Sequence, residues 1–355
     1  LNTERRETEN EIFKKAAETI EKEGLDHRRV IVVSGKGWHP GVVGIAAAYA
    51  MLLFFGTPSV PPVEGLFGGG LDHLLPSAIL SWAVNMVVVF VAAVMLNWLN
   101  KTYVFIREHT MMFVTVFLCA TLSNPVVSTS LGTPTLLALA LVVCTYVMFG
   151  TFQQRDSQSV AFLITMILTV CAMQSFVFAL YIPVFIVGFF QMRIFTLRTL
   201  LAVLVGIVVP VWTATAFGWI DPAQVRLPDL LGGIATLRGG VDAGLLLQPM
   251  FMVAVGTIFG LSNALTLISY RQQLRAYNGF INVMAVATVL FMVADVSHAE
   301  AYSVVANMLA AVQVAHFFTI RKMPKLYIVF FALMAVCIAL SPAVIYNLLN
   351  LLQLI

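Results

Sequence analysis

The sequence predicts an all-α polytopic membrane protein of about 10–11 transmembrane helices, preceded by a short incomplete α/β N-terminal segment. Three observations lead to this fold class. The 355 residues are 60% hydrophobic and only 10% charged, whereas soluble proteins are about 45–50% apolar and about 25% charged. Apolar stretches of membrane-crossing length follow one another from residue 74 onward. Residues 1–50 hold eight basic and eight acidic side chains, while the other 305 residues hold only twelve and nine.

The first segment, residues 1–47, has the pattern of a fragment of an α/β domain. Residues 2–23 are rich in Glu, Lys and Ala, and their apolar side chains recur at three- and four-residue steps, which predicts an amphipathic helix. Gly24 supplies a stop signal for this helix. The β-branched run Val30–Val33 then predicts a buried strand, and a glycine-containing turn leads into the start of a second helix.

The turn after this strand has two interpretations. A glycine-rich turn between a strand and a helix can present backbone N–H groups to a phosphate. However, the sequence from Ser34 to Gly44 contains neither the Lys-Ser/Thr pair of the Walker pattern nor the G-x-G-x-x-G pattern of dinucleotide sites. Spacing alone therefore favours a tight turn over a phosphate site.

A motif follows the strand, and it consists of Gly37, Trp38, His39, Pro40, Gly41 and Gly44. Together with the strand, this motif resembles the RecJ single-strand-specific exonuclease family over residues 1–47. The resemblance implies the end of the helix that joins the DHH and DHHA1 domains of that family, and then the opening strand and helix of DHHA1. The family's metal-holding Asp- and His-rich motifs do not occur in this sequence. We therefore expect no catalytic residue, metal site or cofactor, and we give His39 no catalytic role.

The rest of the chain divides into a junction, 48–73, and a multi-pass helical membrane domain, 74–355. A weaker candidate span lies at 42–60 and is followed by an external loop. The expected spans of the membrane domain are 74–97, 110–126, 133–152, 159–175, 176–192, 196–217, 244–268, 279–295, 300–320 and 326–345. The stretch 159–192 is only 34 residues long, which leaves a re-entrant pair as an alternative to two full crossings.

Basic residues alternate along the membrane domain. Ten of its twelve Lys and Arg residues fall in or beside every second break, namely 98–109, 153–158, 191–195, 269–278 and 321–325. The positive-inside rule makes these breaks cytoplasmic. The N-terminus is then cytoplasmic and the C-terminus periplasmic, in a bacterial inner membrane. Loop 218–243 balances its two Arg with three Asp, and we expect it outside.

Isolated polar side chains occur within the expected spans, namely Asn85, Gln174, Asn263, Asn307, Gln313 and His316. We interpret the amides as hydrogen-bonding partners of neighbouring helices, and we place His316 at headgroup level near the cytoplasmic end. Asp295, His298 and Glu300 cluster at an outer break, where a hydrated loop is favoured over a cation site. The four cysteines lie in apolar runs and are expected to pack as small hydrophobic residues.

Several short features of residues 61–217 lie near expected span ends, including Leu96–Asn100, Tyr181–Pro183 and Arg193–Arg198. Through them this stretch resembles, more loosely, a group of uncharacterised polytopic membrane proteins from Bacteroidetes. The resemblance implies location and topology but no activity.

The leading functional hypothesis is an integral inner-membrane protein of undefined biochemical activity, with a role in transport or in the cell envelope as its extension. The alternative is a single-stranded-DNA exonuclease assignment that comes only from residues 1–47, which lack the catalytic motifs. The balanced charge of this segment disfavours a tethered nucleic-acid-binding module, because phosphate affinity grows with the number of cationic contacts. The expected partner is the lipid bilayer, no nucleic acid is expected for the membrane domain, and the oligomeric state stays open.

Overall fold

The computed structural model describes residues 78–106, 110–154, 157–219, 243–267, 270–320, 326–342 and 344–345. These residues form helices joined by short connections, and they contain no β-strand. The all-α prediction is therefore confirmed for this part of the chain. The expected α/β segment 1–47, its Gly37–Gly44 motif, the junction 48–73 and the weak span 42–60 all lie outside the described residues.

Each of the ten ranges expected to cross the membrane contains a helix. The helices are α3 (Ala78–Tyr103), α4 (Met112–Leu122), α5 (Pro125–Ser128), α6 (Thr133–Phe149), α7 (Gln158–Gln174), η2 (Phe176–Tyr181), α8 (Ile182–Gln191), α9 (Leu197–Ala216), α11 (Ala243–Leu267), α12 (Gln272–Ala294), η5 (Val296–Tyr302), α13 (Ser303–Ile320) and α14 (Leu326–Ala339). The short 3₁₀ helices η2 and η5 lead directly into α8 and α13.

Five of the described helical stretches are long and apolar enough to cross a membrane, namely Ile79–Tyr103, Leu197–Ala216, Leu246–Ala264, Gln272–Ala294 and Val296–Thr319. Five further apolar helices are shorter, with 10–17 residues each. A helix rises about 1.5 Å per residue, so even a 17-residue helix extends about 25 Å through the hydrocarbon core, which is about 30 Å thick. The five longer helices thus have the length and composition of membrane-crossing helices.

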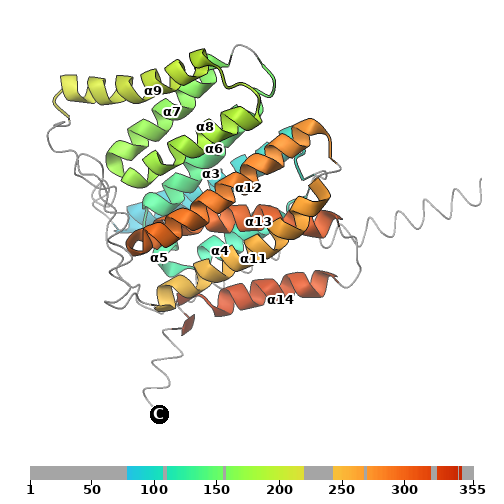
Figure 1. Ribbon diagram of the computed structural model, residues 1–355. Coiled ribbons are helices and arrows are strands. Elements are labelled where there is room, and N and C mark those ends of the chain that lie inside the picture. Colours follow the sequence, from blue (N-terminus) through green and yellow to red (C-terminus); the bar gives the residue numbers. More distant parts are fainter. Residues whose placement is uncertain are drawn as a thin grey trace, which may run out of the picture.

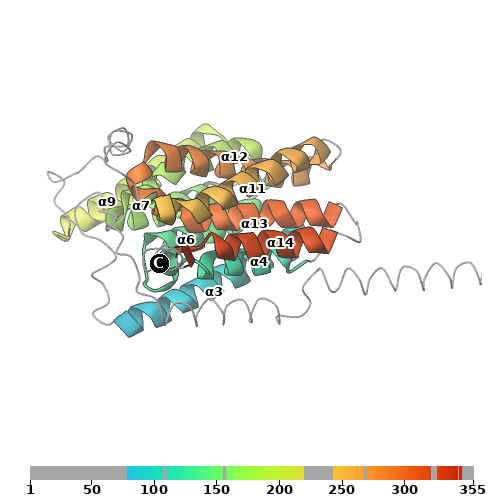
Figure 2. The ribbon, with the colours of Figure 1, turned by 90° about the horizontal axis from the view of Figure 1, so that it is seen from below.

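The helices lie alongside one another as a bundle around α13 (Figures 1 and 2). α13 contacts α4, α6, α11 and α12, while α7 and α9 pack on each other at one side of the bundle. The most apolar stretch of Val296–Thr319 is 94% buried, whereas that of Leu197–Ala216 is only 28% buried. α13 is therefore the core of the bundle, and α9 belongs to its outer surface.

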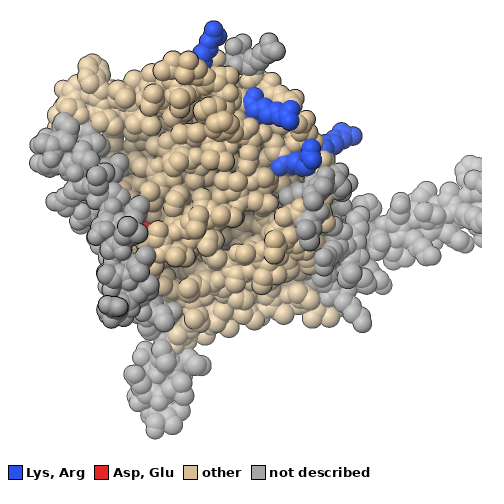
Figure 3. All heavy atoms as spheres, viewed as in Figure 1, with Lys and Arg blue, Asp and Glu red and all other residues tan. Residues whose placement is uncertain are grey.

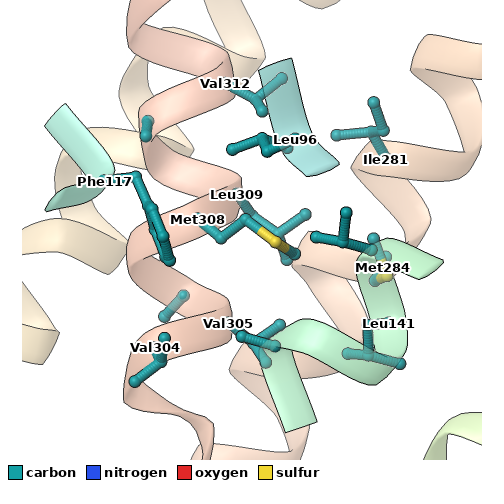
Figure 4. Packing of buried hydrophobic residues seen from close by; sticks show 14 of the residues in the cluster. Leu96, Phe117, Leu141, Ile281, Met284, Val304, Val305, Met308, Leu309 and Val312 are labelled. Carbon is teal, nitrogen blue, oxygen red and sulfur yellow. The ribbon is translucent and has the colours of Figure 1, made fainter. Parts of the chain in front are cut away.

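Large apolar side chains fill the space around α13 (Figure 4). This helix contributes Val304, Val305, Met308, Leu309 and Val312, and its neighbours contribute Leu96, Phe117, Leu141, Ile281 and Met284. Each of these side chains is no more than 3% exposed. Because the lipid is as apolar as these residues, helix association here depends on close packing rather than on removal from water.

The expected span 110–126 is not one continuous helix. α4 ends at Leu122, and Asn124 has an extended backbone (φ −93°, ψ 108°) ahead of Pro125. Proline disfavours helical geometry in the residue before it, and the Asn124 side chain accepts a hydrogen bond of 3.1 Å from the Val126 N–H to cap α5. The sequence prediction of one uninterrupted helix over 110–126 is therefore wrong, because this local chemistry divides the range into α4 and α5.

The stretch 159–192 folds into two helical segments joined by one residue. Ser175 has an extended backbone (φ −152°, ψ 122°) and ends α7, after which η2 and α8 follow at once. Figure 1 shows α7 and α8 as a hairpin whose turn lies at one end of the bundle. Short helices and the absence of a loop together explain why 34 residues accommodate both segments.

The charges of the described helices are separated between the two ends of the bundle. Basic residues occur at Lys101, Arg193, Arg198, Arg271 and Arg275, all exposed and all at or near helix ends. Figure 3 shows the visible Lys and Arg side chains gathered at one end. The acidic residues of the described part, Asp295 and Glu300, lie at the opposite end, where α12 turns into η5.

Candidate functional site

Small residues on α11 face α13 and bring the two helices close together. Gly256, Gly260 and Ala264 recur every four residues and so share one face of the helix. A Cβ atom at Gly256 would lie 3.0 Å from both the Cα and the Cβ of Ala310 on α13. Glycine at this position therefore permits the close approach of the two helices, as small residues commonly do in membranes.

A groove of about 340 Å³ lies between α11, α12 and α13. Its rim includes Leu261 on α11 and Val286 and Leu290 on α12, which are 61–70% exposed. The groove therefore opens on the outer surface of the bundle. Its volume lies at the lower end of the range of about 300–1,000 Å³ that is typical of sites for small molecules.

The lining of this groove is apolar except for four polar side chains: Thr257, Asn282, Thr288 and Gln313. None of the lining residues is charged. The two threonine hydroxyls donate to carbonyls of their own helices, Thr257 to Val253 O at 2.7 Å and Thr288 to Met284 O at 2.8 Å. The two amides do more, because they connect the helices to each other.

Three amide side chains form a chain across α11, α13 and α12. The Asn263 Nδ2 donates to the backbone oxygen of Gln313 at 2.9 Å and to its Oε1 at 3.0 Å. The Gln313 Nε2 donates to Asn282 Oδ1 at 2.7 Å. The prediction that Asn263 and Gln313 bond neighbouring helices is therefore confirmed, and both contribute to the same chain beside the groove.

The hydrogen bonds of this amide chain all run from donor to acceptor in the order Asn263, Gln313, Asn282. A backbone carbonyl can only accept, so Asn263 must turn its nitrogen towards Gln313. That leaves Gln313 Oε1 as an acceptor, places Gln313 Nε2 towards Asn282 and makes Asn282 Oδ1 an acceptor in turn. The chain thus ends in the Nδ2 donor of Asn282, for which the described residues provide no acceptor.

The end of α13 that follows Gln313 holds a buried histidine. His316 lies one turn beyond Gln313 on α13 and is 1% exposed, and its Nε2 lies 3.2 Å from the hydroxyl of Tyr270. His316 is therefore enclosed by other helices, while its expected headgroup-level depth in the membrane stays a prediction.

The opposite end of the bundle, where α12 turns into η5, holds a buried carboxylate. Asp295 is 2% exposed and accepts hydrogen bonds from Ser297 Oγ at 3.0 Å and from Tyr302 at 3.2 Å. His298 Nδ1 lies 2.8 Å from Asp295 Oδ1, and because a carboxylate only accepts, Nδ1 carries the hydrogen. Glu300 is also buried, at 7% exposure. The favoured interpretation of this cluster as a hydrated loop is therefore wrong for both acids.

The chemistry of this cluster is limited by its geometry. Ser297 Oγ and Asp295 both approach Nδ1 of His298, whereas a hydrolytic triad needs the serine on the other ring nitrogen. Within the described residues, no group of three His, Cys, Asp or Glu side chains is placed to hold a metal ion. Burial alone raises the pKa of Asp295, but the hydrogen bond and charge of His298 and the bonds from Ser297 and Tyr302 outweigh it and lower the pKa.

The three remaining predicted amides differ from one another in their surroundings. Asn85 donates to Val127 O at 2.8 Å and so bonds a neighbouring helix, as expected. Gln174 is exposed at the end of α7, which contradicts the expectation. Asn307 is 2% exposed, and its Oδ1 has no hydrogen-bond partner among the described residues.

Sequence reasoning missed two amides inside the predicted spans that bond other helices. Asn282 ends the amide chain, and Gln248 on α11 donates to Ala120 O at 3.0 Å and to Ser123 Oγ at 2.5 Å, where α4 ends. Both lie inside predicted apolar spans, which is the signal that identified Asn263.

No family model, curated protein or solved structure matches the chain.

Proposed function

We propose that this chain is a multi-pass protein of the bacterial inner membrane that binds a membrane-dissolved amphipathic molecule in the groove between α11, α12 and α13. Its role would then lie in transport or in the cell envelope. The observation that carries the proposal is a groove with an apolar lining, a polar amide chain and a rim on the outer surface of the bundle. Such a site suits a molecule that enters sideways from the bilayer.

The proposed topology has ten crossings in the membrane domain, with the connections that carry basic residues in the cytoplasm and the C-terminus in the periplasm. Its support is the separation of charge between the two ends of the bundle. On a cysteine-free background, an impermeant thiol reagent applied to intact cells should label Trp219→Cys and leave Arg275→Cys unlabelled. Labelling of Arg275→Cys alone would reverse the orientation.

Occupancy of the groove can be tested by photolabelling of the full-length protein in lipid nanodiscs. The probe is the methyl ester of a long-chain fatty acid with a diazirine in its chain, and mass spectrometry locates the labelled peptides. Val286→Trp fills the groove rim, whereas Val293→Trp is a matched control on the same helix, since both valines are 61% exposed and only Val286 lines the groove.

We expect labelling of α11 and α12 to fall several-fold in Val286→Trp and to stay at the level of the unmodified protein in Val293→Trp. Equal labelling of the groove peptides in both variants would show that the probe meets only the general lipid-facing surface. The binding proposal would then be wrong, whatever the topology.

A further inference from the structure

We infer that the groove selects neutral molecules that carry a carbonyl-type oxygen, as esters and ketones do, and that Asn282 Nδ2 donates a hydrogen bond to this oxygen. The inference rests on the proposed function, because it names the class of molecule that the groove takes. It follows from three properties of the lining: the direction of the amide chain, the use of the other donors and the absence of charge.

The direction of the amide chain turns a donor towards the groove. The Gln313 backbone oxygen fixes Asn263, which fixes Gln313, which fixes Asn282 with its oxygen inward. Rotation of the Asn282 amide by 180° would place its nitrogen against the Gln313 nitrogen, so that two donors would face each other. Packing of three helices therefore sets which half of the Asn282 amide a ligand meets.

The two threonine hydroxyls of the lining do not compete for an acceptor. The hydroxyl hydrogens of Thr257 and Thr288 are used by carbonyls within α11 and α12. The Thr288 oxygen also lies 3.0 Å from the hydroxyl of Tyr181. Among the described lining residues, the Asn282 amide nitrogen is thus the nitrogen that makes no hydrogen bond, while Gln313 Nε2 uses one of its two N–H groups on Asn282.

The surroundings explain why the partner is a neutral acceptor. Hydrocarbon offers neither water nor acceptors, so an N–H without a partner is unfavourable there, and an oxygen-bearing ligand removes this penalty. An anion would also supply acceptors, but the lining holds no Lys or Arg to balance its charge. Arg275 precedes Asn282 by seven residues, about 10 Å along the helix, and is exposed at the inner end.

Two matched probes test this selectivity on the full-length protein in nanodiscs. One is the diazirine fatty acid methyl ester, and the other is a diazirine alkane of the same chain length without the ester. We expect the ester to label the groove peptides about three- to tenfold more than the alkane at equal membrane concentration, which is the preference that one ordinary hydrogen bond supplies.

Variants of the amide chain assign the preference to its residues. Asn282→Leu combined with Gln313→Leu removes the terminal donor together with the amide that could replace it. We expect this double variant to label equally with ester and alkane, while alkane labelling stays at the original level. Asn282→Gln keeps a donor and should keep a preference. Asn85→Leu is the control, because it removes a buried amide on α3 that lies outside the groove lining.

The outcomes separate this inference from the proposed function. Equal labelling by the two probes in the unmodified protein overturns the selectivity for an acceptor, even where Val286→Trp blocks both probes and so supports the groove. A preference for the ester that survives in the double variant assigns recognition to other residues and also overturns the inference. Labelling by both probes that Val286→Trp does not reduce refutes the binding groove itself.

Discussion

Helices α9 and α13 show that the more polar helix of this membrane protein is the buried one. α13 lies at the centre of the bundle and carries Asn307, Gln313 and His316, each no more than 4% exposed. α9 lies on the outer surface and presents side chains such as Leu204 and Trp212, which are 51% and 70% exposed. In a soluble protein this arrangement would be reversed.

The difference teaches what holds each helix in place. An apolar side chain on α9 gains little from burial, because the lipid around it is equally apolar. α13 is surrounded by protein, so its polar side chains find partners and its apolar side chains fill fixed spaces. We therefore expect substitutions near α13 to act through packing and hydrogen bonds, and substitutions on the outer face of α9 to have small effects.

The largest expected effect separates the two regions directly. Phe117→Ala opens a cavity beside α13, where Phe117 is 1% exposed, and should destabilise the protein by about 3–5 kcal/mol. Trp212→Ala on α9 should change the free energy of unfolding by no more than about 0.5 kcal/mol, because lipid replaces the lost side chain. Unfolding by sodium dodecyl sulfate in mixed micelles measures both. Similar losses for the two variants would show that the comparison between the helices is wrong.

A smaller effect distinguishes two kinds of helix contact. A Cβ at Gly206 of α9 would collide with Thr165 Oγ1 and lie 2.8 Å from Phe162 O on α7, so Gly206→Ala should cost about 1–3 kcal/mol. At Gly260 the nearest atom would be Gln313 Cδ at 3.5 Å, an ordinary contact. Gly260→Ala should thus be neutral or stabilise by up to about 1 kcal/mol through helix propensity. The same unfolding assay measures both variants. A stabilising effect of Gly206→Ala together with a destabilising effect of Gly260→Ala would show that α9 is held less tightly than α11.

The smallest expected effect concerns the pH dependence of stability at Asp295, which lies just before the span that contains α13. Because the folded state lowers the pKa of Asp295, its carboxylate contributes stability that is present at neutral pH and is lost as the pH falls below about 4. Asp295→Asn should therefore unfold more easily than the unmodified protein at pH 7, and the difference should shrink towards pH 3. Unfolding temperatures measured across this range provide the test. A difference that grows on acidification would contradict the assigned hydrogen bonds.

Much of the helix layout was predictable because membrane-crossing helices depend on local composition. Each expected range from 74–97 to 326–345 contains a helix, since about 17–25 apolar residues bounded by polar breaks leave few other structures in lipid. The prediction failed at 110–126, where Asn124 and Pro125 interrupt the helix and Gln248 from a distant segment bonds its end. Asn124 and Pro125 were visible in the sequence, but the bond from Gln248 to the end of α4 was not.

The candidate site was predictable only in part. Asn263 and Gln313 were recognised as hydrogen-bonding residues, because an amide in an apolar span needs a partner. Asn282 was missed, although it lies in a predicted span and determines what the groove presents to a ligand. Asp295 and Glu300 were placed in a hydrated loop because charged residues at a break are usually solvated, whereas η5 folds them inward.

The sequence by itself determined that the described part has apolar helices like those of a membrane protein, roughly where they lie, and how basic residues alternate along the chain. The predicted ends are less exact, since α12 begins at Gln272 rather than 279 and α3 ends at Tyr103 rather than 97. Only the tertiary structure decided that α13 is central, that α9 is peripheral and that three amides meet beside a groove. The physical reason is that lipid and protein interior are similarly apolar. An outward-facing leucine and a buried leucine therefore give the same pattern in the sequence, and only packing between helices tells them apart.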